Sequence, residues 1–192
     1  MNSAGRPAIF LDRDGTLNVE RSFVRSPAEL ELLPNVKEAL ARLDAAGFAL
    51  VVVTNQSGVA RGLYDEAQLA RIHAVLHERL HRLPLAYLHC PHLPEAPGGY
   101  GGPCRCRKPA AGLLHEANEL LGVRFEGSAV IGDSARDLLM AQGLPLTKVL
   151  VRSGKPVAAE RQRLQAAGIA PDHEAEDLAA AVDWLLAGRA RR

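Results

Sequence analysis

Residues 8–18, AIFLDRDGTLN, place four apolar residues directly before two aspartates that stand one residue apart. Side chains alternate between the faces of an extended strand, so we expect Asp12 and Asp14 on one side and Arg13 on the other. Two carboxylates on one side repel each other unless a cation or a proton compensates their charge. The stretch therefore predicts a strand that ends at a cation site.

Similar apolar runs alternate with helical patterns along the rest of the chain. Residues 48–54, FALVVVT, form a nearly unbroken apolar run, which is typical of a strand buried on both faces. Apolar residues at helical spacing in 35–47 predict a helix before it. Further helices are expected at 66–81, 110–121, 135–142 and, as a pair, after residue 151, and further strands at 85–89, 128–132 and 147–151. This alternation predicts an α/β fold, with a doubly wound, Rossmann-like parallel sheet and helices on both faces.

The bulk composition is that of an ordinary globular protein. The 192 residues are 47% hydrophobic and 23% charged, so one domain spanning residues 1–192 is expected. The net charge of +1 gives no electrostatic basis for binding nucleic acid or an acidic membrane. No apolar run approaches the roughly 18 to 20 residues of a membrane span. We expect a cytoplasmic monomer with neither nucleic acid nor a membrane as a partner.

Polar clusters follow four of the expected strands. Ligands of open parallel sheets bind at the carboxyl ends of the strands, so these clusters are expected at one edge. They are Asp12 and Asp14, then TNQSG (54–58), then a loop that ends in Arg107 and Lys108, then GDSARD (132–137).

These residue types suit phosphoryl transfer. The carboxylates of Asp12, Asp14 and Asp133 are hard oxygen ligands of the kind that hold Mg²⁺. Thr54 and Asn55 can bind phosphate oxygens, and Lys108 supplies a positive charge beside a helix start fixed by a proline. One aspartate can attack phosphorus while the other transfers protons to and from the oxygens. The sequence therefore predicts a phosphoryl-transfer site.

The motifs DRDGT, TNQ, RKP and GDSARD, in this order, resemble the four motifs of the haloacid dehalogenase-like (HAD-like) phosphatases over essentially the whole chain. The resemblance implies a nucleophilic Asp12 and a general acid/base Asp14, with an aspartyl-phosphate intermediate. It also implies Mg²⁺ held by the Asp12 carboxylate, the Asp14 backbone carbonyl and Asp133, with support from Asp137. The residues that it implies for stabilising the phosphoryl group are Thr54, Arg107 and Lys108.

All three cysteines of the chain lie in the Pro- and Gly-rich segment 90–106, which we call the cysteine loop. Cys90, His92, Cys104 and Cys106 form a Cys-x-His, eleven-residue, Cys-x-Cys arrangement that suits a closed tetrahedral zinc site. With four protein ligands the zinc is structural, and it would order a loop with little apolar content. The neighbouring His89 is expected to point away from Cys90 along an extended strand.

Only about forty residues separate the first two motifs, which leaves no room for the cap domain that many HAD-like enzymes carry. TNQSGVARG (54–62) and KVLVRSGK (148–155) are similar to the heptose bisphosphate phosphatases of the family, whereas the histidinol-phosphate phosphatases typically follow TNQ with an acidic residue and Gly. This similarity implies hydrolysis of heptose 1,7-bisphosphate to the 1-phosphate, a step towards ADP-heptose for lipopolysaccharide cores. One departure is Ser134, which stands where some heptose phosphatases have Lys.

By the same similarity, the substrate would contact Glu20, Arg21, Ser22, Phe23, Asn55, Gln56 and Ser57. We add Arg61 as a cation for the second phosphate, because a guanidinium can hold phosphate in a bidentate way. Arg21 and Phe23 taken alone fit equally well with a surface charge and a packing aromatic, and Arg61 with a solvent-exposed arginine.

Other classes explain less of the sequence. A histidinol-phosphate phosphatase stays open as the sibling activity. Phospho-accepting receiver domains also combine strand-end aspartates, a Thr and a Lys, but they carry two adjacent acids after the first strand, and here one residue separates them. A zinc-stapled interaction module would explain the cysteines and leave the aspartates unexplained.

Overall fold

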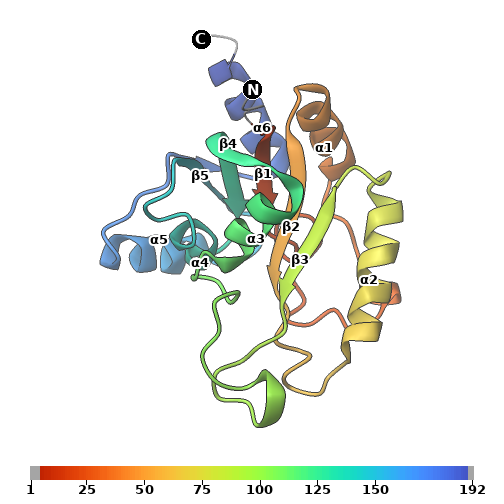
Figure 1. Cartoon of the computed structure of the whole chain (residues 1–192). Coiled ribbons are helices and arrows are strands. Elements are labelled where there is room, and N and C mark those ends of the chain that lie inside the picture. Colours follow the sequence, from red (N-terminus) through yellow and green to blue (C-terminus); the bar gives the residue numbers. More distant parts are fainter. Residues whose placement is uncertain (1–4, 190–192) are drawn as a thin grey trace.

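The computed structural model describes residues 5–189, in which six parallel strands form one sheet with helices on both faces (Figure 1). The strand order is β3-β2-β1-β4-β5-β6. The strands are β1 (Pro7–Leu11), β2 (Ala49–Asn55), β3 (Ala86–Cys90), β4 (Arg124–Gly132), β5 (Leu146–Val151) and β6 (His173–Ala175). Every paired strand is parallel to its neighbour, which confirms the predicted doubly wound sheet.

The helices of the described residues are α1 (Val36–Ala45), α2 (Glu66–Arg79), α3 (Gly112–Leu121), α4 (Ala135–Leu139), α5 (Val157–Ala166) and α6 (Leu178–Arg189). Two short 3₁₀ turns, η1 (Pro27–Glu29) and η2 (Gly98–Tyr100), lie in connecting loops. None of the described helices is long and apolar enough to cross a membrane.

Successive side chains of β1 point to opposite faces of the sheet, so they contribute to two separate layers of the core. Ile9 and Leu11 are buried in the cluster that receives apolar residues of α1, α2 and α6. Ala8 and Phe10 are buried on the opposite face, where α3 packs. Because apolar layers cover both faces of β1, its carboxyl end is held rigidly at the centre of the sheet.

Three elements differ from the sequence prediction. The strand β6 was not expected, because its three residues HEA carry no apolar run. The helix α3 begins at Gly112, after a turn closed by the bond from Ala110 N to Arg107 O (2.8 Å), so Pro109 does not lie in its first turn. The helix α4 ends at Leu139 and continues as turns.

Candidate active site

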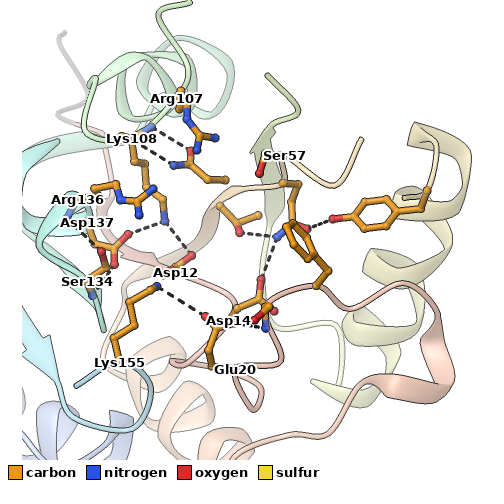
Figure 2. Close-up of a pocket in the computed structure, with 16 residues that line it drawn as sticks. Asp12, Asp14, Glu20, Ser57, Arg107, Lys108, Ser134, Arg136, Asp137 and Lys155 are labelled. Atoms are coloured by element: carbon orange, nitrogen blue, oxygen red, sulfur yellow. Dashed lines mark hydrogen bonds and ion pairs between the residues drawn. The ribbon is translucent and has the colours of Figure 1, made fainter. Parts of the chain in front are cut away.

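A cavity of about 340 Å³ opens at the carboxyl ends of the strands (Figure 2). The structure brings most of the predicted site residues together around it. Those that line it are Asp12, Asp14, Glu20, Ser22, Phe23, Thr54, Asn55, Gln56, Ser57, Arg107, Lys108 and Asp137. Four lining residues had not been predicted as site residues, namely Tyr64, Ser134, Arg136 and Lys155.

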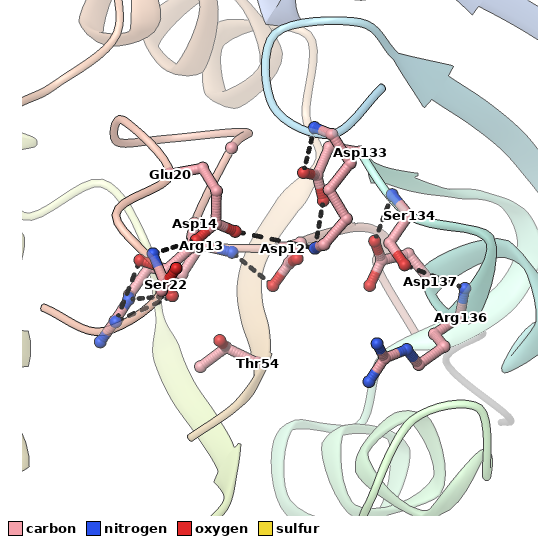
Figure 3. Close-up of polar contacts among 12 residues, drawn as sticks. Asp12, Arg13, Asp14, Glu20, Ser22, Thr54, Asp133, Ser134, Arg136 and Asp137 are labelled. Atoms are coloured by element: carbon pink, nitrogen blue, oxygen red, sulfur yellow. Dashed lines mark hydrogen bonds and ion pairs between the residues drawn. The ribbon is translucent and has the colours of Figure 1, made fainter. Parts of the chain in front are cut away.

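Three buried carboxylates converge beside this cavity (Figure 3). Asp12, Asp133 and Asp137 each offer an oxygen, and these oxygens lie within 4.8 Å of one another. Burial, followed by the charge of Asp12, raises the pKa of Asp133 to about 7 and that of Asp137 to about 6. Asp133 Oδ1 accepts no hydrogen bond from any described residue and has Lys155 Nζ 3.5 Å away as an ion-pair partner. An oxygen-rich, negatively charged cluster with an unsatisfied buried oxygen fits a hard divalent cation.

Lys108 is the cation nearest to the first aspartate. Its Nζ lies 2.8 Å from Asp12 Oδ1 and 2.6 Å from Asp137 Oδ1, and it donates to Val53 O at 2.9 Å. Burial alone would lower the pKa of Lys108, but the two carboxylates outweigh it and raise that pKa. The Asn55 amide fixes the Lys108 backbone, accepting from Lys108 N (3.0 Å) and donating to Lys108 O (3.1 Å).

Asp14 turns its carboxylate away from the acidic cluster. Arg13 Nη2 donates to Asp14 Oδ2 at 2.8 Å, and Asn18 Nδ2 and Gln56 Nε2 donate at 2.9 and 3.0 Å. Burial raises the pKa of Asp14, but Arg13 and these hydrogen bonds outweigh it, and the net shift is downward. The expectation that Arg13 would point to the opposite side was wrong, because β1 ends at Leu11 and the chain then turns.

Gln56 links Asp14 to the second strand-end cluster. Its Nε2 donates to Asp14 Oδ2 at 3.0 Å and to Thr54 Oγ1 at 2.9 Å. Tyr64 Oη donates to Gln56 Oε1 at 2.8 Å, which fixes the orientation of the amide. No spacing in the sequence pointed to Tyr64, since it follows the TNQ motif through an irregular loop.

Asp133 lies in a slot between two glycines of different loops. A Cβ atom on Gly15, whose φ is +78°, or on Gly154 would overlap Asp133 Oδ2. Lys155 N donates to Asp133 Oδ2 at 2.9 Å, and Ser153 Oγ donates to Gly15 O at 2.7 Å. The loop after β5 therefore closes against the loop after β1 and holds Asp133 between them.

The cysteine loop gathers its four predicted ligands into a second cluster. The ligand atoms of Cys90, His92, Cys104 and Cys106 lie within 4.8 Å of one another, and the cysteines form no disulfide. His89 lies elsewhere, with its ring 5.7 Å from that of His73. Four soft or borderline ligands at these separations fit one tetrahedral ion.

Arg107 directly follows the cysteine loop and lines the cavity. Arg107 Nη1 donates to the backbone carbonyl of His92 at 3.0 Å. The cysteine cluster is therefore joined to the cavity wall by a hydrogen bond as well as by the chain.

Two predicted substrate contacts lie outside the lining. Arg21 forms an ion pair with Glu31. The Arg61 guanidinium lies over the Phe23 ring, 5.8 Å from its centroid. Of these residues only Phe23 lines the cavity.

Comparison of the sequence with known proteins places this chain in a family. A family profile described as HAD-hydrolase-like matches residues 105–181. D-glycero-β-D-manno-heptose-1,7-bisphosphate 7-phosphatase of Haemophilus ducreyi is 40% identical over 83% of this chain and 90% of its own. The enzyme of the same name from Escherichia coli K12 is 41% identical over 81% of this chain and 84% of its own.

Solved structures agree with these sequence matches. The crystal structure of D,D-heptose 1,7-bisphosphate phosphatase from B. bronchiseptica, complexed with magnesium and phosphate, has a TM-score of 0.79 at 37% identity and covers 95% of this chain and 99% of that one. The corresponding structure from Burkholderia thailandensis has a TM-score of 0.65 at 31% identity, with 94% and 99% covered.

Proposed function

This chain belongs to the D-glycero-β-D-manno-heptose-1,7-bisphosphate 7-phosphatase family of HAD-like hydrolases, and we propose that it hydrolyses heptose 1,7-bisphosphate to heptose 1-phosphate and inorganic phosphate. The reaction is a step towards ADP-heptose for lipopolysaccharide cores. The observation that carries the proposal is the meeting of three buried carboxylates with Lys108 in one strand-end cavity. The chain acts as a cytoplasmic monomer with one capless domain.

In the first step, a carboxylate oxygen of Asp12 attacks the phosphorus of the 7-phosphate. The new O–P bond forms as the bond to the sugar oxygen breaks, and Asp14 donates a proton to that leaving oxygen. In the second step, Asp14 takes a proton from water, which attacks the aspartyl-phosphate and releases inorganic phosphate. Lys108 and the Thr54 hydroxyl stabilise the charge on the transferred group in both steps.

Asp14 is positioned for these proton transfers by its neighbours. Donors from Arg13, Asn18 and Gln56 hold its carboxylate at the cavity wall. Because these donors favour the ionised carboxylate and lower its pKa, they suit the second step, in which Asp14 takes a proton from water, and they oppose the protonated form that the first step needs.

Two metal ions complete the proposal. Mg²⁺ would be held by the carboxylates of Asp12 and Asp133 and the backbone carbonyl of Asp14, with Asp137 in support, and it would neutralise charge on the phosphoryl oxygens when bound. Zn²⁺ would be held by Cys90, His92, Cys104 and Cys106. With all four positions taken by protein, the zinc orders the loop over 90–106 and takes no part in the reaction.

A substrate panel with Mg²⁺ tests the function. The panel compares heptose 1,7-bisphosphate with histidinol phosphate and with simple monophosphates, and phosphorus NMR of the product shows which phosphate leaves. We expect the bisphosphate to have the highest kcat/KM and the 1-phosphate to be the product. Faster turnover of histidinol phosphate would overturn the substrate assignment, and a stable phosphoprotein without turnover would indicate a phospho-accepting domain instead.

A further inference from the structure

We propose that Arg136 binds the second, non-reacting phosphate of the substrate and thereby selects a bisphosphate over a monophosphate. The inference rests on the proposed function, since it concerns the half of the substrate that does not react. The reacting phosphate is accounted for by Asp12, Lys108 and Thr54, which leaves a second dianion to be held by a loop cation.

Four basic side chains line the cavity, namely Arg107, Lys108, Arg136 and Lys155. Two of them are already committed to acids. Lys108 is only 3% exposed and is shared between Asp12 and Asp137. Lys155 Nζ lies 3.5 Å from Asp133 Oδ1 and 3.7 Å from Glu20 Oε2. These two lysines balance the acids of the site and have little positive charge left for a second phosphate.

Arg136 differs from them because its guanidinium is uncommitted. Its side chain makes no ion pair and donates no hydrogen bond to another residue within 5–189, although it is exposed and lines the cavity. Figures 2 and 3 both show its guanidinium directed towards the cavity. A free guanidinium has five donors in a planar fork, which matches two oxygens of a phosphate.

The backbone that carries Arg136 is fixed in a capped helical turn. Ser134 Oγ accepts from Arg136 N at 3.3 Å, and Asp137 Oδ2 accepts from Ser134 N at 3.0 Å. The other oxygen of Asp137 pairs with Lys108. The turn that holds Asp137 at the reacting end therefore also fixes the backbone from which the Arg136 side chain extends into the cavity.

Ser134, at the start of the same turn, carries no charge. Resemblance led us to expect a lysine at Ser134, and that hydroxyl is instead used as a helix cap. Arg136 supplies a positive charge two residues further along the same turn. Arg61, the cation that the sequence suggested, does not line the cavity and lies over the Phe23 ring.

Arg107, for which the resemblance implies a role at the reacting phosphoryl group, is also placed to contact the second phosphate. It lines the same cavity, and one of its nitrogens donates to the carbonyl of His92. The rest of its donors are available to a ligand, so one dianion can be shared between two guanidinium groups.

The test compares two substrates in Arg136→Ala. We expect kcat/KM for heptose 1,7-bisphosphate to fall by about 10- to 100-fold, as for the loss of hydrogen bonds to a charged group, with most of the change in KM. Hydrolysis of a simple monophosphate should stay within about twofold. Arg136→Lys keeps the charge but not the planar fork, so its kcat/KM for the bisphosphate should lie between those of the wild type and Arg136→Ala. Arg71→Ala is the matched control, because Arg71 is exposed on α2 and outside the cavity.

Product inhibition gives an independent readout. Heptose 1-phosphate carries only the second phosphate, so its inhibition constant should rise about tenfold in Arg136→Ala, while that of inorganic phosphate should not change. Equal loss on both substrates, or no loss on either, would overturn the assignment of Arg136 and leave the proposed function standing. A wild-type enzyme that does not prefer the bisphosphate would instead remove the proposed function, and this inference with it.

Discussion

The acidic cluster and the cysteine loop lie at the same edge of one sheet, yet they are organised in opposite ways. Asp12, Asp133 and Asp137 follow buried strands, and each is almost fully buried. The cysteine loop is largely exposed between residues 94 and 100, and none of these seven residues belongs to a buried apolar cluster, although Cys90 is buried and Cys106 packs against one such cluster. Burial in the sheet accounts for the position of the carboxylates, whereas little apolar packing holds the middle of the loop, and we propose that a bound zinc ion orders it.

The largest effect is expected from Asp12→Asn. An amide is a poor nucleophile, so kcat should fall by about 10³-fold or more. The fold should persist, because Lys108 keeps its pairing with Asp137. Steady-state kinetics with Mg²⁺ and thermal unfolding of the same preparation check both halves. Turnover close to that of the wild type would rule out Asp12 as the nucleophile.

The second prediction concerns the cysteine loop. Cys104→Ser should release zinc and lower the melting temperature by about 10 °C, equivalent to about 3 kcal/mol, because the loop loses its organising ligand set. Metal analysis of protein purified without added metal should show one tightly held zinc in the wild type. Chelation of Mg²⁺ is the control, and it should stop turnover with little change in melting temperature. An unaltered melting temperature in zinc-free protein would show that the loop is ordered without an ion.

The third prediction moves one carboxylate without removing it. A Cβ atom in Gly154→Ala would overlap Asp133 Oδ2 and would lie 2.8 Å from Gly15 Cα, so Asp133 must shift. We expect kcat to fall by about 10- to 100-fold, since small displacements in a catalytic site are costly. Gly188→Ala is the matched control, because nothing lies within 4 Å of the added Cβ on α6 and a helical alanine adds up to about 1 kcal/mol of stability. Unchanged activity in Gly154→Ala would mean that the slot does not position Asp133.

A pH dependence of stability behind Asp14 is expected to be small near neutral pH and to grow as the pH falls. Burial, followed by the charges of Arg13 and His89, lowers the pKa of His73 to about 3, with Asp14 opposing the shift and the Tyr87 ring stacked on the imidazole. Since the unfolded chain takes up this proton near pH 6.5, His73 contributes stability at neutral pH that is lost as pH falls. The loss is about 1.4 kcal/mol per pH unit between pH 6.5 and 3.

His73→Gln should flatten this part of the stability curve, because glutamine can still accept from Arg13 Nη1 but does not titrate. Denaturant unfolding at pH 7, 6, 5 and 4 measures the slope in both proteins. Parallel slopes would show that His73 does not titrate with folding.

Local patterns in the amino-acid sequence were enough to predict the parallel sheet and most of the reactive side chains. The apolar runs of β1 and β2 are local properties of eight or fewer residues, and their burial on both faces requires a layered α/β sheet. The position of the carboxylates is also predictable, because these acids come directly after strands whose ends can be located in the sequence. The cysteine loop is equally local, since two close pairs of ligands separated by eleven residues predict a zinc site before any fold is known.

The groups that hold these reactive side chains in position come together only in the folded chain. The turn after Leu11 sends Arg13 to Asp14, and the loop after β5 brings Gly154 and Lys155 to Asp133. Gly15 and Ser153 meet although 138 positions separate them. The direction of Arg136 depends likewise on how the first turn of α4 is capped. Such contacts depend on strand order, loop path and rotamer together, and neither periodicity nor residue type encodes the distance between two loops that belong to different strands.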